Sequence, residues 1–229
     1  MDGDDGNIHD QKMRIPIERF PALEAVANLT HAFLGRVPGL DVKTDREQAL
    51  VRLDSFHRDA RGELGLGAVH FVCGEQVHGR EVAAVDAGTA VPVPGVDGVI
   101  TASPGVCLGV YVADCCAVYL VEPERRVIGL LHSGRKGSEL GITRVAIERM
   151  RTEFGCDPVK MIVQLGPCIR PPIYEIDFAA LITAQARAAG VQQVHDCGTC
   201  TGANLDRYYS YRVERGKTGR MLALLALRS

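Results

Sequence analysis

Three short runs of apolar and β-branched residues follow one another in the middle of the chain. They cover residues 106–112, 117–121 and 127–131, and a turn at 122–124 separates the second run from the third. Runs of this composition, bounded by turn residues, are typical of β-strands. Because so few residues connect them, we expect the three strands to pair antiparallel, since a parallel pair needs a long crossover. The centre of the chain is therefore predicted to be rich in strands.

Longer segments elsewhere carry apolar residues at helical spacing. Residues 45–60, 141–154 and 178–189 show this pattern, and Gly155 and Gly190 stand where the last two helices should end. Shorter β-rich segments are expected to form strands at 30–35, 69–73, 81–85, 96–101, 159–165, 191–195 and 221–227. Strands dominate the centre and helices are interspersed, which predicts an α+β fold of mixed β-sheets with flanking helices.

The composition excludes several classes of protein. The chain has 229 residues, of which 46% are hydrophobic, and this suffices for one core. Its formal net charge of −2 provides no basic surface for nucleic acid, and an aromatic content of 5% without Trp argues against stacking on single strands. No apolar run reaches the roughly 20 residues that a membrane span needs. We therefore expect neither a nucleic acid nor a membrane as a partner.

The first ten residues, MDGDDGNIHD, are acidic and polar. A secretory signal needs a positive start followed by an apolar stretch, and this segment has neither. We therefore predict a flexible tail over residues 1–20, a single domain over residues 21–229 and a cytoplasmic location.

Three residues near the ends of predicted strands are potential metal ligands. His78, Cys115 and His132 would together offer two nitrogens and one sulfur. Three protein ligands with a fourth position open are typical of catalytic zinc, whereas structural zinc is normally closed by four. Each residue alone also has an ordinary structural interpretation, and their wide separation in the sequence does not establish that they meet.

The chain has eight cysteines, which a reducing cytosol would keep mostly as thiols. Several stand inside apolar runs, where a cysteine acts as a small hydrophobic residue. Cys197 and Cys200 form a Cys-x-x-Cys pair, which could be half of a zinc site or a redox pair. No second Cys-x-x-Cys pair is present to complete a four-cysteine zinc site.

Two adjacent cations, Arg135 and Lys136, stand between Gly134 and Gly137. Glycines let backbone N–H groups approach an anion, and the helix expected to begin near Gly141 would add its positive end. This predicts a glycine loop that binds phosphate, and a solvated basic turn is the alternative. Further along, Arg212 offers a fork that suits phosphate or carboxylate.

Taken in order, short phrases across residues 30–229 resemble the laccase-domain or multicopper polyphenol oxidoreductase family, whose members are now better described as zinc-dependent purine nucleoside enzymes. The phrases include QVHG at 76–79, DGVIT at 97–101, VYVADC at 110–115, GPCI at 166–169, YYSYR at 208–212 and TGRM at 218–221. Each phrase is weak alone, and the ordered set is specific.

The resemblance implies a fold, a cofactor and an activity. The fold would be an α+β domain of mixed sheets similar to that of cysteine hydrolases and deamidating toxins of the cytotoxic-necrotizing-factor type. His78, Cys115 and His132 match the family's metal ligands, which implies zinc. The implied reactions are phosphorolysis of adenosine, inosine, guanosine and methylthioadenosine, and deamination of adenosine, so nucleoside and phosphate are the expected partners. Some bacterial members are linked to correction of peptidoglycan precursors.

The chain departs from the family where the usual phrase is Ala-Gly-Trp-Arg-Gly, because Arg135 replaces the tryptophan and Lys136 the arginine. A charge therefore replaces a large apolar wall, and a point charge replaces a bidentate fork. Arg135, Lys136 and Arg212 remain the residues predicted to bind phosphate or another part of the substrate. A catalytically altered relative that only binds its ligand is one alternative function.

Two other functions use the same residues. Without metal, Cys115 as nucleophile and His132 as base would give an amidase or deamidase that acts by acyl transfer. With copper, two histidines and a cysteine could support phenol oxidation, because Cu²⁺ binds such ligands strongly. The chain has only seven histidines and no His-x-His pair, so a multicopper oxidase is the less favoured prediction.

Overall fold

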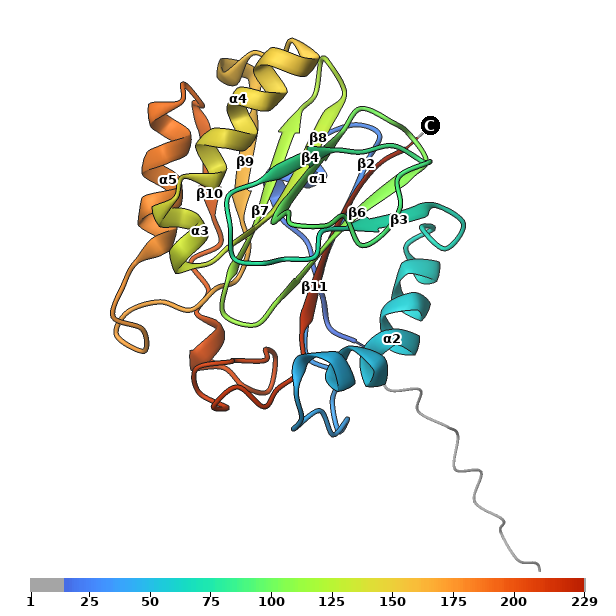
Figure 1. Ribbon diagram of the computed structural model, residues 1–229, viewed down its shortest axis with the longest axis vertical. Helices are drawn as coiled ribbons and strands as arrows, with labels where there is room; N and C mark the ends of the chain where they lie inside the picture. Colours follow the sequence, from blue (N-terminus) through green and yellow to red (C-terminus); the bar gives the residue numbers. More distant parts are fainter. Residues whose placement is uncertain (1–14, 229) are drawn as a thin grey trace, which may run out of the picture.

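Two mixed β-sheets form the centre of the fold, and helices cover their outer faces (Figure 1). The computed structural model describes residues 15–228. The five-stranded sheet has the order β1 (Ile17–Glu18), β2 (Leu29–Leu34), β11 (Met221–Leu227), β6 (Val106–Val112) and β3 (His70–Cys73). The six-stranded sheet has the order β10 (Gln193–Asp196), β9 (Ile162–Leu165), β7 (Cys116–Glu122), β8 (Val127–Ser133), β5 (Gly98–Thr101) and β4 (Val82–Ala84).

The strand β11 shows how the sheets are packed. Alternate side chains of a strand point to opposite faces. Ala223 and Leu225 belong to the core between the sheets, in one cluster with Tyr119 of β7. Leu222 and Leu224 belong to a second cluster on the outer face of the five-stranded sheet. Both faces of β11 are therefore buried, which explains why its sequence is apolar without alternation.

The helices accompany the sheets in different places. They are α1 (Pro21–Glu24), α2 (Arg46–Glu63), α3 (Arg135–Glu139), α4 (Ile142–Phe154) and α5 (Phe178–Ala188), with 3₁₀ turns at Pro158–Lys160 and Thr201–Ala203. Leu23 of the short α1 lies in the core between the sheets. Apolar residues of α4 and α5 share a buried cluster with β7, β8 and β9 of the six-stranded sheet. Gly155 ends α4 in the left-handed region with φ of 67°, as expected for a residue without a Cβ atom. The predicted helices at 45–60, 141–154 and 178–189 are therefore confirmed.

The expected antiparallel pairing of the three central runs is wrong for the first of them. β7 and β8 pair antiparallel, but β6 lies in the other sheet, antiparallel to β11 and parallel to β3. The chain leaves one sheet and enters the other at the connection that contains Asp114, a residue with a positive φ of 83°. The short link between β6 and β7 is thus a crossing between sheets.

The predicted N-terminal tail over residues 1–20 is too long. Residues 1–14 lie outside the described part of the chain, but Ile17–Glu18 forms β1 and pairs antiparallel with β2. Phe20 is buried, its N–H donates to His31 Nε2 at 2.8 Å, and its ring contacts that of Tyr119. The burial of the Phe20 ring therefore fixes this segment against the core.

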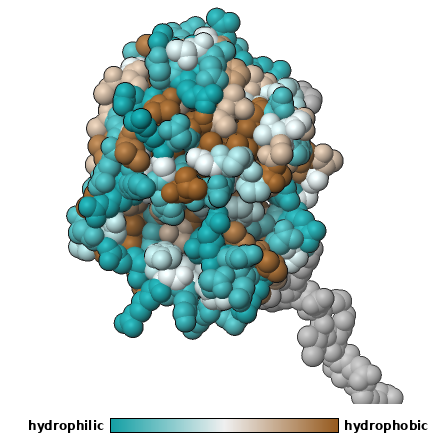
Figure 2. Space-filling view, viewed as in Figure 1, coloured by the Kyte–Doolittle hydropathy of each residue, from teal (hydrophilic) through white to brown (hydrophobic). Residues whose placement is uncertain are grey.

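Within residues 15–228, no helix has both the length and the apolar character needed to cross a membrane. The face of the molecule in Figure 2 mixes hydrophilic and hydrophobic side chains, and hydrophilic ones surround the hydrophobic patches.

The buried Tyr119 gives a test of the contact between the sheets. Its hydroxyl donates to the Ala32 carbonyl of β2 at 2.9 Å across the core. Tyr119→Phe should lower the free energy of unfolding by about 1 kcal/mol, the usual net value of such a bond. Urea unfolding measures the loss, with Tyr211→Phe as the control because that side chain is exposed. An unchanged midpoint for Tyr119→Phe would contradict this role.

Candidate metal centre and its pocket

The three residues singled out as potential metal ligands come together in the structure. One ligand atom from each of His78, Cys115 and His132 lies within 4.8 Å of the others. The two imidazole rings have centroids 4.8 Å apart and are nearly perpendicular, with an angle of 80°. In the described part of the chain this is the one group of three or more His, Cys, Asp or Glu residues that could hold a metal ion.

Two of these residues lie on connections that pass from one sheet to the other. His78 lies between β3 of the five-stranded sheet and β4 of the six-stranded sheet. Cys115 lies likewise between β6 and β7. His132 is on β8 and pairs with Ala117 of β7, directly beyond the second crossing. The site therefore forms at the junction of the two sheets.

A buried carboxylate, that of Asp97, holds two of the candidate ligands in place. His132 donates from Nδ1 to Asp97 Oδ1 at 2.8 Å, which leaves Nε2 free to bind a metal. The backbone N–H groups of Val77, His78 and Gly79 donate to the same carboxylate at 3.1, 2.9 and 2.7 Å. A carboxylate behind a metal-binding histidine fixes the ring and its tautomer.

Sequence reasoning did not assign a role to Asp97. Burial would raise the pKa of this carboxyl, but hydrogen bonds from His132 and from the Gly79 backbone hold it below its ordinary value. Asp97 stands directly before the buried strand β5 and begins the phrase DGVIT that resembles the family, but neither feature specified its role.

Two further side chains shape the loop and the space around the thiol. Gln76 donates to the Tyr111 carbonyl at 2.6 Å and accepts from the Tyr111 N–H at 3.0 Å, so it binds the His78 loop to β6. Gly134 lies so close to Cys115 that a Cβ atom there would be 2.5 Å from Sγ. A residue larger than glycine at 134 would displace the thiol.

Asp114 binds the C-terminal part of the chain to the second crossing. Its buried carboxylate accepts from Thr201 Oγ1 at 2.7 Å, from Ser210 Oγ at 3.0 Å and from the Arg212 N–H at 2.7 Å. Burial raises the pKa of Asp114, and these donors oppose that effect. The carboxylate of the residue before Cys115 therefore binds groups that lie 87 to 98 residues further along the chain.

The Cys115 thiol and the His132 imidazole shift each other's pKa. Burial alone would raise the pKa of Cys115, but the neighbouring His132 and His78 rings lower it to about 6. Burial alone would lower the pKa of His132, but Cys115 and Asp97 raise it to about 9. Around neutral pH the metal-free pair is thus a thiolate beside an imidazolium, and a thiolate is the form that binds metal and attacks electrophiles.

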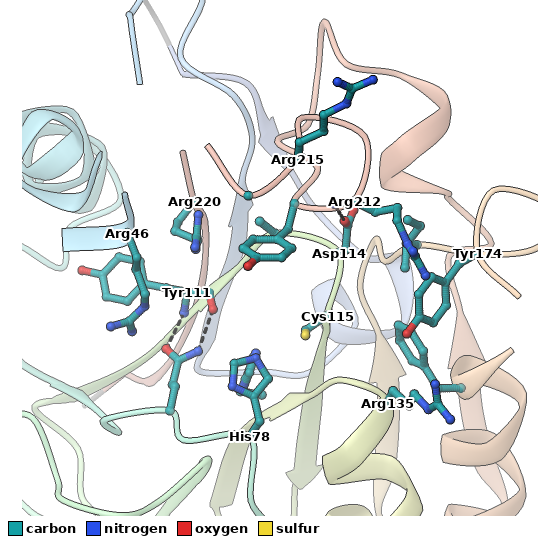
Figure 3. A pocket seen from close by; sticks show the side chains of 17 residues that line it. Arg46, His78, Tyr111, Asp114, Cys115, Arg135, Tyr174, Arg212, Arg215 and Arg220 are labelled. Atoms are coloured by element: carbon teal, nitrogen blue, oxygen red, sulfur yellow. Dashed lines mark hydrogen bonds between the residues drawn. The ribbon is translucent and has the colours of Figure 1, made fainter. Parts of the chain in front are cut away.

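A pocket of about 710 Å³ opens beside these residues (Figure 3). His78, Cys115 and His132 all line it. One wall is aromatic: Tyr174 and Phe178 pack edge to face with ring centroids 6.0 Å apart, and the guanidinium of Arg212 lies 4.8 Å from the Tyr174 ring centre. The volume and the mixed lining suit a small organic ligand.

Of the three residues predicted to bind phosphate, two line the pocket and one does not. Arg135 and Arg212 line the pocket and form ion pairs with Glu139 at 3.0 Å and Glu175 at 2.8 Å. Lys136 is exposed and is not among the described residues that line the pocket.

The predicted glycine loop around Arg135 and Lys136 is wrong. Residues Arg135–Glu139 form the short helix α3, for which Gly134 is the extended N-cap. The helix is held from its C-terminal side, because Gln185 of α5 donates to the Ser138 carbonyl at 2.7 Å.

Cys197 and Cys200 do not join the candidate metal centre. Both are half-buried thiols outside the pocket lining, and no third ligand accompanies them among the described residues. Burial raises the pKa of Cys197 to about 11, which makes it unreactive at neutral pH. The structure therefore gives no support to a zinc half-site or a redox pair at these positions.

The sequence matches a known family over most of its length. Residues 39–178 and 174–228 match the family described as multi-copper polyphenol oxidoreductase laccase. The chain belongs to this family. It is 34% identical to the purine nucleoside phosphorylase ORF3 of Streptomyces griseus, over 71% of this chain and 76% of that protein. It is 31% identical to the purine nucleoside phosphorylase YlmD of Geobacillus stearothermophilus, over 91% of this chain and 92% of that protein.

Solved structures of relatives share the fold. The crystal structure of YlmD from Geobacillus stearothermophilus superposes with a TM-score of 0.80 at 27% identity, covering 92% of this chain and 94% of that one. The Neisseria meningitidis protein NMB0706 has a TM-score of 0.78 at 21% identity, a likeness of fold alone. The α+β arrangement of two mixed sheets with flanking helices is therefore that of the family.

The paired titration of Cys115 and His132 predicts the reactivity of the metal-free protein. Alkylation of Cys115 by iodoacetamide should rise with pH around a midpoint near 6, because the thiolate appears above its lowered pKa. Cys107 should stay unmodified at neutral pH, since burial raises its pKa to about 12. Peptide mass spectrometry across pH 5 to 10 measures both sites. A midpoint for Cys115 near the ordinary thiol value would contradict the proposed pairing.

Proposed function

We propose that the protein is a zinc-dependent purine nucleoside phosphorylase. The observation that carries the proposal is the convergence of His78, Cys115 and His132 at the wall of a pocket large enough for a nucleoside. The names of the family relatives supply the substrate class. Adenosine, inosine, guanosine and methylthioadenosine are the proposed nucleosides, with adenosine deamination as a second activity.

The ligand set fits zinc better than copper. Two imidazoles and one thiolate, with no fourth ligand among residues 15–228, leave a coordination position open. Zinc bound there would supply Lewis acidity to a reaction in the pocket. Copper also binds such ligands, but the described residues offer one metal site, and a multicopper oxidase needs several.

The chain's own residues would bind and orient the substrate. Tyr174 lines the pocket with a partly exposed ring on which a purine can stack, and the buried Phe178 packs edge to face against it. Arg135 and Arg212 lie beside them as candidates for substrate binding, although each already has a carboxylate partner. Asp97 keeps the His132 ring fixed through its Nδ1 hydrogen bond, so that Nε2 faces the site.

A metal-free amidase or deamidase is the second candidate. The Cys115 thiolate lies beside the His132 ring, and that ring donates to the buried Asp97 carboxylate. A thiolate, an imidazole and a carboxylate in contact in this order are the components of a nucleophilic triad. The likeness to cysteine hydrolases and deamidating toxins, which stays a prediction, would agree with it. Activity that survives chelation and is lost on alkylation of Cys115 would favour this function.

The proposal predicts the metal content and the activity of purified protein. Protein prepared without chelators should contain about one zinc ion per chain, because it offers one three-residue site. It should release free base from purine nucleosides only when phosphate is present. Cys115→Ala should lose the zinc and the base release, as measured by metal mass spectrometry and by chromatography of the products.

Cys197→Ala is the matched control for that experiment, because Cys197 lies outside the pocket lining. It should keep both the zinc and the activity. Stoichiometric zinc without turnover of any nucleoside would overturn the phosphorylase, and no bound metal would shift the proposal to the cysteine hydrolase.

The carboxylate behind His132 gives a second test. Asp97→Asn should weaken zinc binding by roughly 10- to 100-fold, the usual effect of removing such a partner. Asp206→Asn, which removes an exposed carboxylate, is the control for the change in charge. Competition with a chromophoric chelator measures both affinities, and equal values for the two variants would show that Asp97 does not support the metal.

A further inference from the structure

A second pair of arginines, Arg46 and Arg220, lines the same pocket. In Figure 3 both lie on one side of His78 and Cys115, whereas Tyr174, Arg135 and Arg212 lie on the other. The pocket therefore has two cationic ends with the candidate metal centre between them.

The two ends differ in how their charges are compensated. Arg135 and Arg212 each form an ion pair with a glutamate, as described above. Neither Arg46 nor Arg220 forms an ion pair with a carboxylate in the described part of the chain. The second pair therefore has unused capacity for an anion.

Arg220 is fixed and buried, with 8% of its surface exposed. Its Nη1 donates to the carbonyls of Thr218 and Gly219 at 2.9 Å each, and no described residue accepts from its other nitrogens. Burying a guanidinium without an adjacent counter-charge is costly, and such groups are normally paired. Arg220 thus presents a preorganised donor edge to the pocket.

Arg46 adds a second positive charge from the exposed start of α2. Burial lowers the pKa of Arg220, and the nearby charge of Arg46 lowers it further, while Cys115 and Asp114 offset part of the effect. Two guanidiniums that repel each other across a pocket are stabilised by an anion between them, and the arginine fork matches phosphate oxygens.

We infer that Arg220 and Arg46 form the phosphate subsite, while the purine lies against Tyr174, so that the ribose lies beside His78 and Cys115. This inference rests on the proposed function. In the reaction a phosphate oxygen forms a bond to the anomeric carbon of the ribose, and the bond from that carbon to the purine nitrogen breaks. The electron pair leaves with the purine, which takes up a proton, and no oxidant or reductant is needed.

Binding of inorganic phosphate to the purified zinc protein tests the subsite, with titration calorimetry as the measurement. Arg220→Gln should weaken phosphate binding by about 10-fold or more, as expected for lost hydrogen bonds to a charged group. Arg220→Lys should recover part of the affinity, because it restores the charge without the fork. Arg46→Gln should weaken binding less, and its exposed position makes it safe for the fold if Arg220→Gln does not fold.

Arg215→Gln is the matched control, because Arg215 lines the pocket but its guanidinium points away from Cys115 in Figure 3. It removes the same charge and should leave phosphate binding unchanged. In the turnover assay, the Arg220 and Arg46 variants should raise KM for phosphate and leave KM for the nucleoside nearly unchanged.

The outcomes separate the subsite from the proposed function. Phosphate affinity that is unchanged in both Arg220→Gln and Arg46→Gln, or that falls equally in Arg215→Gln, overturns the subsite. A loss of phosphate affinity in Arg135→Gln in place of Arg220→Gln would also overturn it, although phosphorolysis by the wild type would still stand. Phosphate binding that depends on Arg220 in a protein that cleaves no nucleoside would sustain the subsite and overturn the phosphorylase.

Discussion

The carboxylate of Asp97 is the interaction on which the rest of the site depends. It accepts from the His132 ring and from three consecutive backbone N–H groups of the loop that carries His78. One buried charge therefore fixes a strand residue and a loop residue relative to each other. Burial of an unpaired carboxylate is unfavourable, and the four hydrogen bonds that Asp97 accepts compensate for its loss of hydration. Cys115 then completes the set from the neighbouring crossing.

The architecture explains why these candidate ligands can meet at all. In a single sheet, the distance between His78 and Cys115 would depend only on the order of the strands that they follow. Here both residues lie on links between two packed sheets, so each is drawn to the junction of the sheets. The same junction opens into the pocket, whose aromatic wall comes from the helical side and whose buried arginine precedes β11. The two links between the sheets, β3 to β4 and β6 to β7, therefore belong both to the fold and to the site.

Local patterns in the sequence predicted the parts of the structure that depend on local physics. Helical spacing and a terminal glycine predicted α4 and its end at Gly155. The sheet assignment of β6 was not predictable, because its partner β11 is more than 100 residues away and apolar runs do not specify partners. The role of Asp97 was hidden for the same reason, since its histidine partner is 35 residues distant. The ordered phrases around His78, Cys115 and His132 indicated three candidate ligands that the fold brings together. The loop expected around Lys136 is a short helix, and the role predicted for that residue stays a prediction.

Zinc X-ray absorption spectroscopy of the purified protein tests the central claim most directly. Two imidazoles, one thiolate and an open position predict one sulfur at about 2.3 Å, two nitrogens at about 2.0 to 2.1 Å and one further light atom from solvent or substrate. Cys115→Ala should remove the sulfur contribution. A zinc shell with two or more sulfurs, or with no sulfur in the wild type, would contradict the assignment of His78, Cys115 and His132 as the metal ligands.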